Sequence, residues 1–74
     1  MARIDVVVEM TATIWKIHVQ EGDLVSAGDT LVTLESMKME IPVVAPSGGT
    51  VTLLALKEGD PVVEGEVVCR LESS

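Results

Sequence analysis

Glu35-Ser36-Met37-Lys38-Met39-Glu40 lies near the centre of the 74-residue chain and joins two halves that are rich in valine, leucine and isoleucine. Two-residue connections between antiparallel strands favour Asn-Gly or Asp-Gly, because both central residues tend to need a positive φ angle. Met37-Lys38 offers neither of the preferred dipeptides. We therefore expect either a longer loop at this point or residues that are present for something other than the turn.

The two halves align without a gap when the sequence is shifted by 37 positions. Glu21-Gly22-Asp23 then matches Glu58-Gly59-Asp60, and Leu34-Glu35-Ser36 matches Leu71-Glu72-Ser73. Apolar positions follow the same spacing, in the pairs Ile14/Val51, Ile17/Leu54, Val19/Leu56, Leu31/Val68 and Val32/Cys69. Two units are too few for a solenoid, so the repeat indicates a closed domain with a pseudo-twofold axis.

Short valine-rich segments separated by turn residues are typical of antiparallel strands in a sandwich or barrel. The predicted strands are 4–8, 12–19, 24–25, 30–36, 39–44, 49–56, 61–63 and 66–72. Alternation predicts one face with Val32, Leu34, Cys69 and Leu71, and an opposite face with Thr33, Glu35, Arg70 and Glu72. The segment 12–19 breaks this alternation, and a bulge near Trp15-Lys16 would restore it and leave Trp15 partly exposed. Packing at the core or its rim is favoured for Trp15 over the alternative of a ligand platform.

Residues that recur in both halves are interpreted as scaffold. Asp23 and Asp60 can accept hydrogen bonds from turn amides. The glycines at repeated positions are expected where turns need a positive φ angle, and they are Gly22, Gly28, Gly59 and Gly65. The acidic pairs Glu21/Asp23 and Glu58/Asp60 are images of one another, so turn chemistry explains them better than catalysis does.

Composition describes one acidic domain spanning residues 1–74. Twelve acidic and five basic residues give a net charge of −7, which argues against nucleic acid and anionic membranes as partners and favours solubility. The apolar run Val6-Val7-Val8 is far too short to span a membrane. One cysteine and no secretory signal predict the reducing cytoplasm, and we expect a monomer when the protein is free.

No residue set has the spacing of a catalytic site. His18 stands alone and is expected to be solvated, with no cysteine or aspartate at ligand spacing. Cys69 is expected to be a small buried hydrophobe rather than a nucleophile. Neither a metal motif nor a phosphate-binding loop occurs in the sequence. The chain is therefore predicted not to be an enzyme on its own.

Met37-Lys38-Met39 has no counterpart in the second copy, which ends at Ser74. Pseudo-symmetry then places the Lys38 hairpin and the two chain ends at opposite poles. A lysine at a free pole is open to an enzyme from many sides, and methionines beside it offer flexible, polarizable contact surfaces. The alternative is a solvated lysine on a hairpin tip whose neighbouring methionines fill no role.

Residues 35–41, with Glu-Gly-Asp before them, Ala45–Val51 after them and a second Glu-Gly-Asp later, resemble the biotinyl/lipoyl attachment domain family. The resemblance covers nearly the whole chain and is closest to free-standing attachment proteins, the small relatives of biotin carboxyl carrier protein. It implies an all-β, flattened β-barrel (a barrel-sandwich hybrid) of two four-stranded antiparallel sheets with pseudo-twofold symmetry.

The resemblance also implies that Lys38 is joined to biotin by a biotin protein ligase, with Met37 and Met39 as flanking recognition residues. Biotin would then carry a carboxyl group between biotin carboxylase and carboxyltransferase sites, while the domain supplies presentation. Lipoyl acceptors usually have Asp-Lys-Ala here, so lipoate on Lys38 is the lesser alternative. A third alternative is an unmodified module that binds partners through its acidic surface.

The sequence departs from the family pattern in three places. Ser36 stands where alanine is usual, Thr11-Ala12 replaces a Pro-Gly pair, and the segment from Gly22 to Gly28 is too short for a protruding thumb loop. A flexible Ala/Pro linker is also missing. Because a tether raises the effective concentration at partner sites, its absence predicts a carrier that acts in trans.

Overall fold

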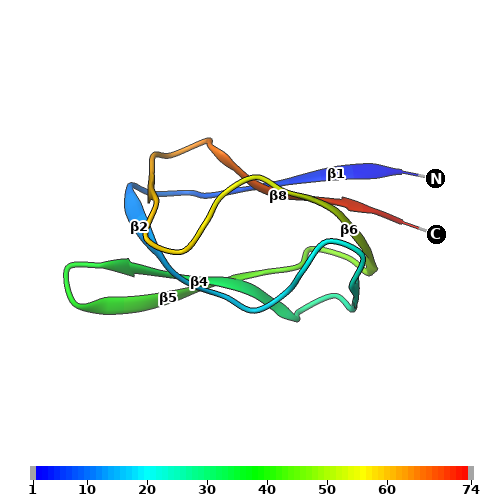
Figure 1. Ribbon diagram of the computed structural model, residues 1–74, viewed down its shortest axis with the longest axis horizontal. Helices are drawn as coiled ribbons and strands as arrows, with labels where there is room; N and C mark the ends of the chain where they lie inside the picture. The colour runs from blue at the N-terminus through cyan, green and yellow to red at the C-terminus, as the bar shows by residue number, and fades with distance from the viewer. Residues whose placement is uncertain (1, 74) are drawn as a thin grey trace.

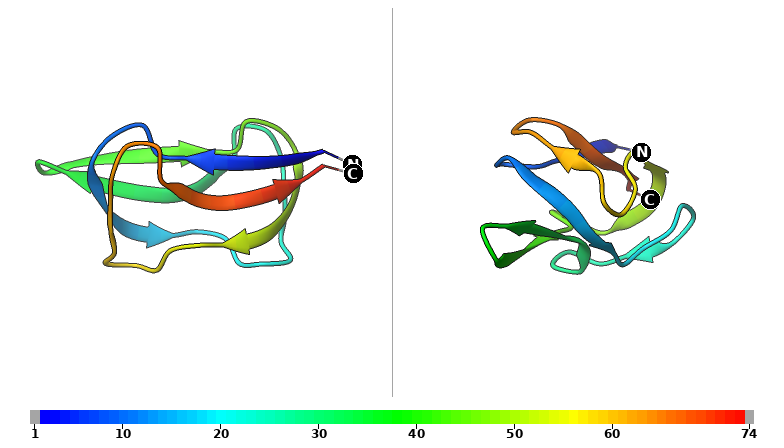
Figure 2. Two further views of the ribbon diagram at one scale, coloured as in Figure 1. Left: turned by 90° about the horizontal axis from the view of Figure 1, so that it is seen from above. Right: turned by 60° about the vertical axis from the view of Figure 1, so that its left-hand side comes forward.

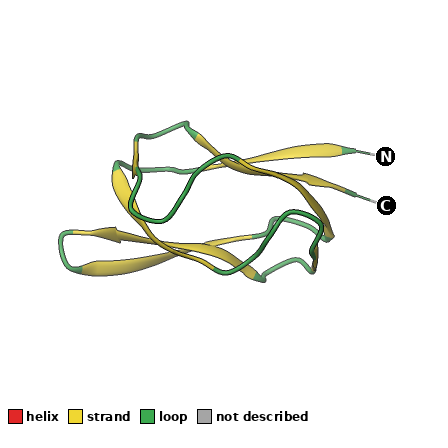
Figure 3. Cartoon of the chain, in the orientation of Figure 1, coloured by secondary structure: helices red, strands yellow, loops and turns green. Residues whose placement is uncertain are grey.

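Valine- and isoleucine-rich segments alternate with glycine turns, and in the computed structural model, which describes residues 2–73, eight of these segments are β-strands (Figure 1). They are β1 (Arg3–Val7), β2 (Ala12–Ile17), β3 (Leu24–Val25), β4 (Thr30–Ser36), β5 (Met39–Val44), β6 (Gly49–Leu54), β7 (Pro61–Val62) and β8 (Val67–Glu72). Within residues 2–73 the remainder is turn and loop, as Figure 3 shows, and no helix is long or apolar enough to cross a membrane.

The strands form two four-stranded sheets, with orders β1-β8-β6-β3 and β5-β4-β2-β7. Every pairing is antiparallel. The predicted all-β barrel of two four-stranded sheets is therefore confirmed. The segments 24–25, 30–36 and 39–44 match the predicted strands, and three others differ by one residue at their ends.

The predicted strands 12–19 and 49–56 were each too long by two residues, and both end at a residue whose amide bonds to a side chain. The Ile17 amide donates to the Glu58 carboxylate at 3.1 Å, and the Leu54 amide donates to the Glu21 carboxylate at 3.0 Å. One backbone bond to the neighbouring strand still follows, from the His18 amide to the Leu31 carbonyl and from the Ala55 amide to the Val68 carbonyl, each at 2.9 Å. On the other side of each strand a carboxylate takes the place of a partner strand, and the regular strands end at Ile17 and Leu54.

The two sheets repeat the same register 37 residues apart. Ile14 pairs with Leu34 between β2 and β4, and their images Val51 and Leu71 pair between β6 and β8. Both ladders shift register directly after these pairs, which confirms the bulge predicted at Trp15-Lys16. The pseudo-twofold relationship therefore extends to irregular features as well as to strand order.

The structure also extends the repeat to the first strand. Sheet order places β1 at the position that β5 occupies in the other sheet. The sequences agree once this is seen, because Ile4 and Val6-Val7 match Ile41 and Val43-Val44 at the same spacing of 37. The repeat predicted from the sequence began at Thr13 and did not include these positions.

The core lies between the sheets, and every buried residue in residues 2–73 is apolar or glycine. The predicted inward residues Val32, Leu34, Cys69 and Leu71 are each 1% exposed or less. Leu31 and Val68 are fully buried as well, beside the register shifts that β4 makes with β5 and β8 makes with β1. These shifts turn consecutive residues toward the core.

The four repeated glycines have φ angles between 89° and 97°, as predicted. Asp23 accepts a hydrogen bond from the Gln20 amide at 2.9 Å, and Asp60 accepts one from the Lys57 amide at 3.0 Å. The molecule is elongated, with extents of 37 × 18 × 17 Å along its principal axes. The β4–β5 hairpin lies at one end of the long axis and the chain ends lie at the other, as predicted (Figures 1 and 2).

Candidate functional site

The β4–β5 connection is a two-residue turn, not a longer loop. Ser36 pairs with Met39, which leaves only Met37 and Lys38 between the strands. Their φ angles are 50° and 68°. Positive φ at both central residues is the backbone of the tight hairpin turn that matches the twist of its strands.

This backbone is costly for the residues that adopt it. A non-glycine side chain in the left-handed region costs about 1 kcal/mol or more, because Cβ approaches the following carbonyl oxygen. Among residues 2–73, Met37 and Lys38 are the non-glycine residues with positive φ. Backbone strain of this kind is concentrated at functional sites, where the surrounding structure holds the residue in its strained conformation.

The turn holds its side chains in solvent. Met37 is 93% exposed and Met39 is 63% exposed, and Lys38 is also exposed. In the part of the chain that the structure describes, Lys38 takes part in no salt bridge or side-chain hydrogen bond. Its side chain is therefore open to an approaching partner protein.

The structure assigns scaffold contacts to other residues that the sequence singled out. His18 is exposed, and its Nε2 lies 2.8 Å from the Thr33 hydroxyl. Trp15 is 41% exposed on the bulge, with the Lys16 amine 5.2 Å from its ring centroid. Within residues 2–73, no three histidine, cysteine or acidic side chains are grouped as metal ligands.

Cys69 is fully buried, and burial raises the pKa of its thiol to about 11. The nucleophilic thiolate is therefore scarce near neutral pH. This agrees with its prediction as a small hydrophobe.

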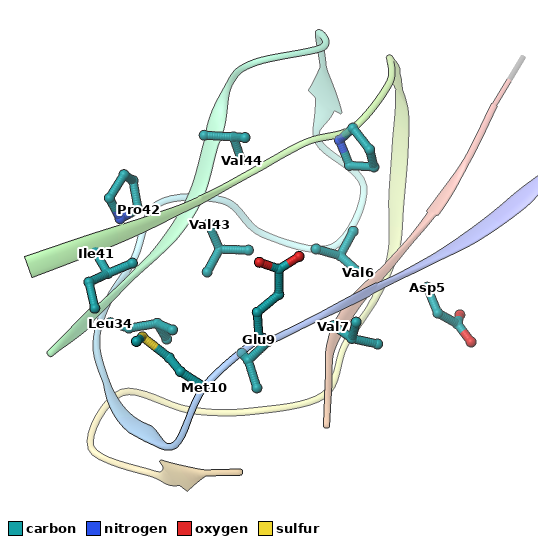
Figure 4. Close-up of a pocket in the computed structure, with 12 residues that line it drawn as sticks. Asp5, Val6, Val7, Glu9, Met10, Leu34, Ile41, Pro42, Val43 and Val44 are labelled. Atoms are coloured by element: carbon teal, nitrogen blue, oxygen red, sulfur yellow. The ribbon is translucent and has the colours of Figure 1, made fainter. Parts of the chain in front are cut away.

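Sequence reasoning missed a groove between the edge strands β1 and β5 (Figure 4). Its lining includes Glu9 and Met10 from the loop after β1, together with Ile41 and Val43 from β5. The strands are far apart in sequence, so only the match of β1 with β5 could have indicated that they lie at one edge of the molecule.

Two matching sheets with one exposed lysine hairpin define a class of small β domains that present a side chain at one pole. The family model described as "Biotin-requiring enzyme" matches residues 3–71. The chain belongs to this biotin/lipoyl attachment domain family.

Relatives of similar length support the assignment. The Biotin/lipoyl attachment protein of Bacillus subtilis is 46% identical over 67 residues, which cover 90% of this chain and 92% of the relative. The Biotinylated protein TB7.3 homolog of Mycobacterium leprae is 44% identical over 64 residues, which cover 86% of this chain and 90% of the relative. The crystal structure of Kluyveromyces lactis urea carboxylase matches with a TM-score of 0.90 and 33% identity, over 97% of this chain but 6% of that one.

Proposed function

We propose that Lys38 is the attachment residue of the domain and that it carries biotin through an amide bond. The observation that carries the proposal is the strained two-residue turn, which holds the Lys38 amine in solvent at the pole opposite the chain ends. The turn has no image in the second half of the repeat. A cofactor arm at this point would be clear of the sheets.

Attachment requires the Lys38 amine to attack an activated carboxyl carbon of biotin. A biotin protein ligase would supply biotinyl adenylate, formed from biotin and ATP with release of pyrophosphate. Attack by the amine then releases AMP, and the amine nitrogen gives up a proton. Met37 and Met39 flank the amine and are largely exposed, so they are suited to contact the ligase. Their side chains offer the ligase an apolar contact surface and carry no charge that would pair with the Lys38 amine.

Biotin supplies carboxyl-transfer chemistry when it is attached, and the domain supplies presentation. We propose biotin carboxylase and carboxyltransferase components as partners, because the fold matches a segment of a urea carboxylase. The domain itself contributes a rigid base for the arm and no catalytic group. We place it in the cytoplasm, in keeping with its free Cys69.

The test is incubation of the purified protein with a biotin protein ligase, biotin and ATP, followed by intact mass and peptide mapping. We expect one biotinyl group on Lys38 and none on a Lys38→Arg variant. Lys16→Arg and Lys57→Arg are matched controls that should still gain one group each. Biotin on Lys16 or Lys57, or on no residue, would contradict the proposal.

Lipoate is the second candidate for the same amine, because the name of the Bacillus subtilis relative joins biotin and lipoyl attachment. A parallel incubation with a lipoate ligase, lipoate and ATP tests it by the same mass measurement. Modification by lipoate alone would replace the biotin assignment. If neither biotin nor lipoate is found on protein from the native host, the hypothesis of an unmodified interaction module is favoured.

A further inference from the structure

The β1–β5 groove is a surface feature that the attachment hairpin does not explain. It has a volume of about 570 Å³, which is within the range of small-molecule pockets. Its walls are mainly apolar, and several of the wall side chains are partly open to solvent, with Val7 42% exposed, Met10 39% exposed and Val44 46% exposed. Solvent-exposed apolar walls lose water favourably when an apolar group covers them.

The groove continues from the attachment hairpin. β5 begins at Met39, directly after Lys38, and runs into the groove at Ile41. At about 3.3 Å per strand residue, Ile41 lies roughly 10 Å from Lys38 and Val43 roughly 17 Å. A biotinyl-lysine arm has eleven bonds from Cα to the bicyclic ring, and its extended length is about 13 Å by the reach of a polypeptide backbone. The ring can therefore reach the part of the groove between Ile41 and Val43.

The chemistry of the groove is asymmetric although its two strands are images of one another. β1 runs toward the hairpin pole, so the residues after it, Glu9 and Met10, lie at that end of the groove (Figure 1). Their repeat images are Pro46 and Ser47. A thioether is thus found only at the end that the arm can reach. Of the two carboxylates in the lining, Asp5 lies earlier on β1 and is paired with Arg70 at 2.7 Å, which leaves Glu9 as the carboxylate near the arm.

The polar group at the hairpin end of the groove complements the ring. Figure 4 shows the Glu9 carboxylate extending between the two strands, among Val6 and Val43. A carboxylate accepts hydrogen bonds only, and the ureido group of biotin has two N–H donors. Apolar contacts with the chain and ring, together with one charge-assisted acceptor, describe a site for a neutral biotin ring.

We propose that the attached biotin arm folds back along β5 and rests in the β1–β5 groove, with its ring against Met10 and its ureido N–H groups on Glu9. This inference rests on the proposed attachment at Lys38. The groove then competes with partner active sites for the ring and shields it from solvent when no partner is docked.

Amide chemical shifts of the unmodified and the biotinylated protein test the proposal. We expect biotinylation to shift Val7, Glu9, Met10 and Val43 as well as the hairpin residues 36–40. Met10→Ser, which installs the repeat image, and Glu9→Gln should each reduce the groove shifts. Leu24→Ser removes a side chain that is 82% exposed outside the groove and should leave them unchanged.

The rate of avidin capture gives an independent readout. If the ring occupies the groove for two-thirds of the time, its release should speed capture about threefold in Met10→Ser relative to the unaltered protein. Biotin on Lys38 with shifts confined to residues 36–40 and unchanged capture rates would overturn the groove proposal and leave the attachment intact. Absence of biotin from Lys38 in the mass spectrum would overturn both.

Discussion

Gly49 lies so close to Glu72 that a Cβ atom on Gly49 would be 2.7 Å from the Glu72 carbonyl oxygen. Gly49 begins β6, whose next residue, Thr50, pairs with Glu72 on β8, and it is itself buried. The contact is with backbone, so no side-chain rotation can relieve it. The repeat image of Gly49 is Ala12, which means that this close approach belongs to one half of the domain only.

Gly49→Ala should therefore destabilise the protein by about 1–3 kcal/mol, the usual cost of forcing atoms into a well-packed site. Gly48→Ala is the matched control, because its Cβ would meet the Val25 carbonyl oxygen at an ordinary 3.4 Å. Urea denaturation followed by circular dichroism measures both. Equal stabilities for the two variants would show that the Glu72 contact yields at no cost.

The attachment turn should be improvable as a turn at the expense of its proposed role. Replacing Met37-Lys38 with Asn-Gly gives the dipeptide that favours positive φ at both positions. We expect the double variant to gain about 1–2 kcal/mol in free energy of unfolding, because the left-handed strain is relieved. The same variant should accept no biotin. Unchanged or lower stability would indicate that the wild-type turn is not strained.

Much of the fold was predictable because its turns are marked in the sequence by repeated glycines. Gly22 and Gly59, at the same place in two copies of one motif, located the strands around them. The equivalence of β1 and β5 was harder to see, because Asp5 corresponds to Pro42 and Glu9 to Pro46. Lys38 was found as the residue that the repeat does not explain. Its backbone conformation was not predicted, since ladder pairing at Ser36 and Met39 overrides local turn preference.

The repeated aspartates give a test of the duplicated scaffold. Asp23→Ala removes the acceptor for the Gln20 amide, and Asp60→Ala removes the acceptor for the Lys57 amide. Each should cost about 1 kcal/mol, the net value of a typical hydrogen bond. Thermal or urea unfolding should give losses that agree within about 0.5 kcal/mol and add in the double variant. If only one of the two variants loses stability, the two turns contribute unequally to the free energy of unfolding.

Cys69 should make stability depend on pH in the alkaline range. Burial raises the pKa of its thiol from 9.0 to about 11, so between these values the unfolded chain loses the proton while the folded chain keeps it. The stabilisation is fully present below pH 9 and is lost as the pH rises toward 11, by an amount on the order of 2 kcal/mol. Urea denaturation at intervals from pH 8 to pH 11 measures the decline. Lysine side chains also titrate in this range, so Cys69→Val, which installs the repeat image Val32, is the control. Its free energy of unfolding should decline less over the same pH range. Parallel pH profiles for the two proteins would mean that the thiol has a similar pKa in the folded and unfolded states.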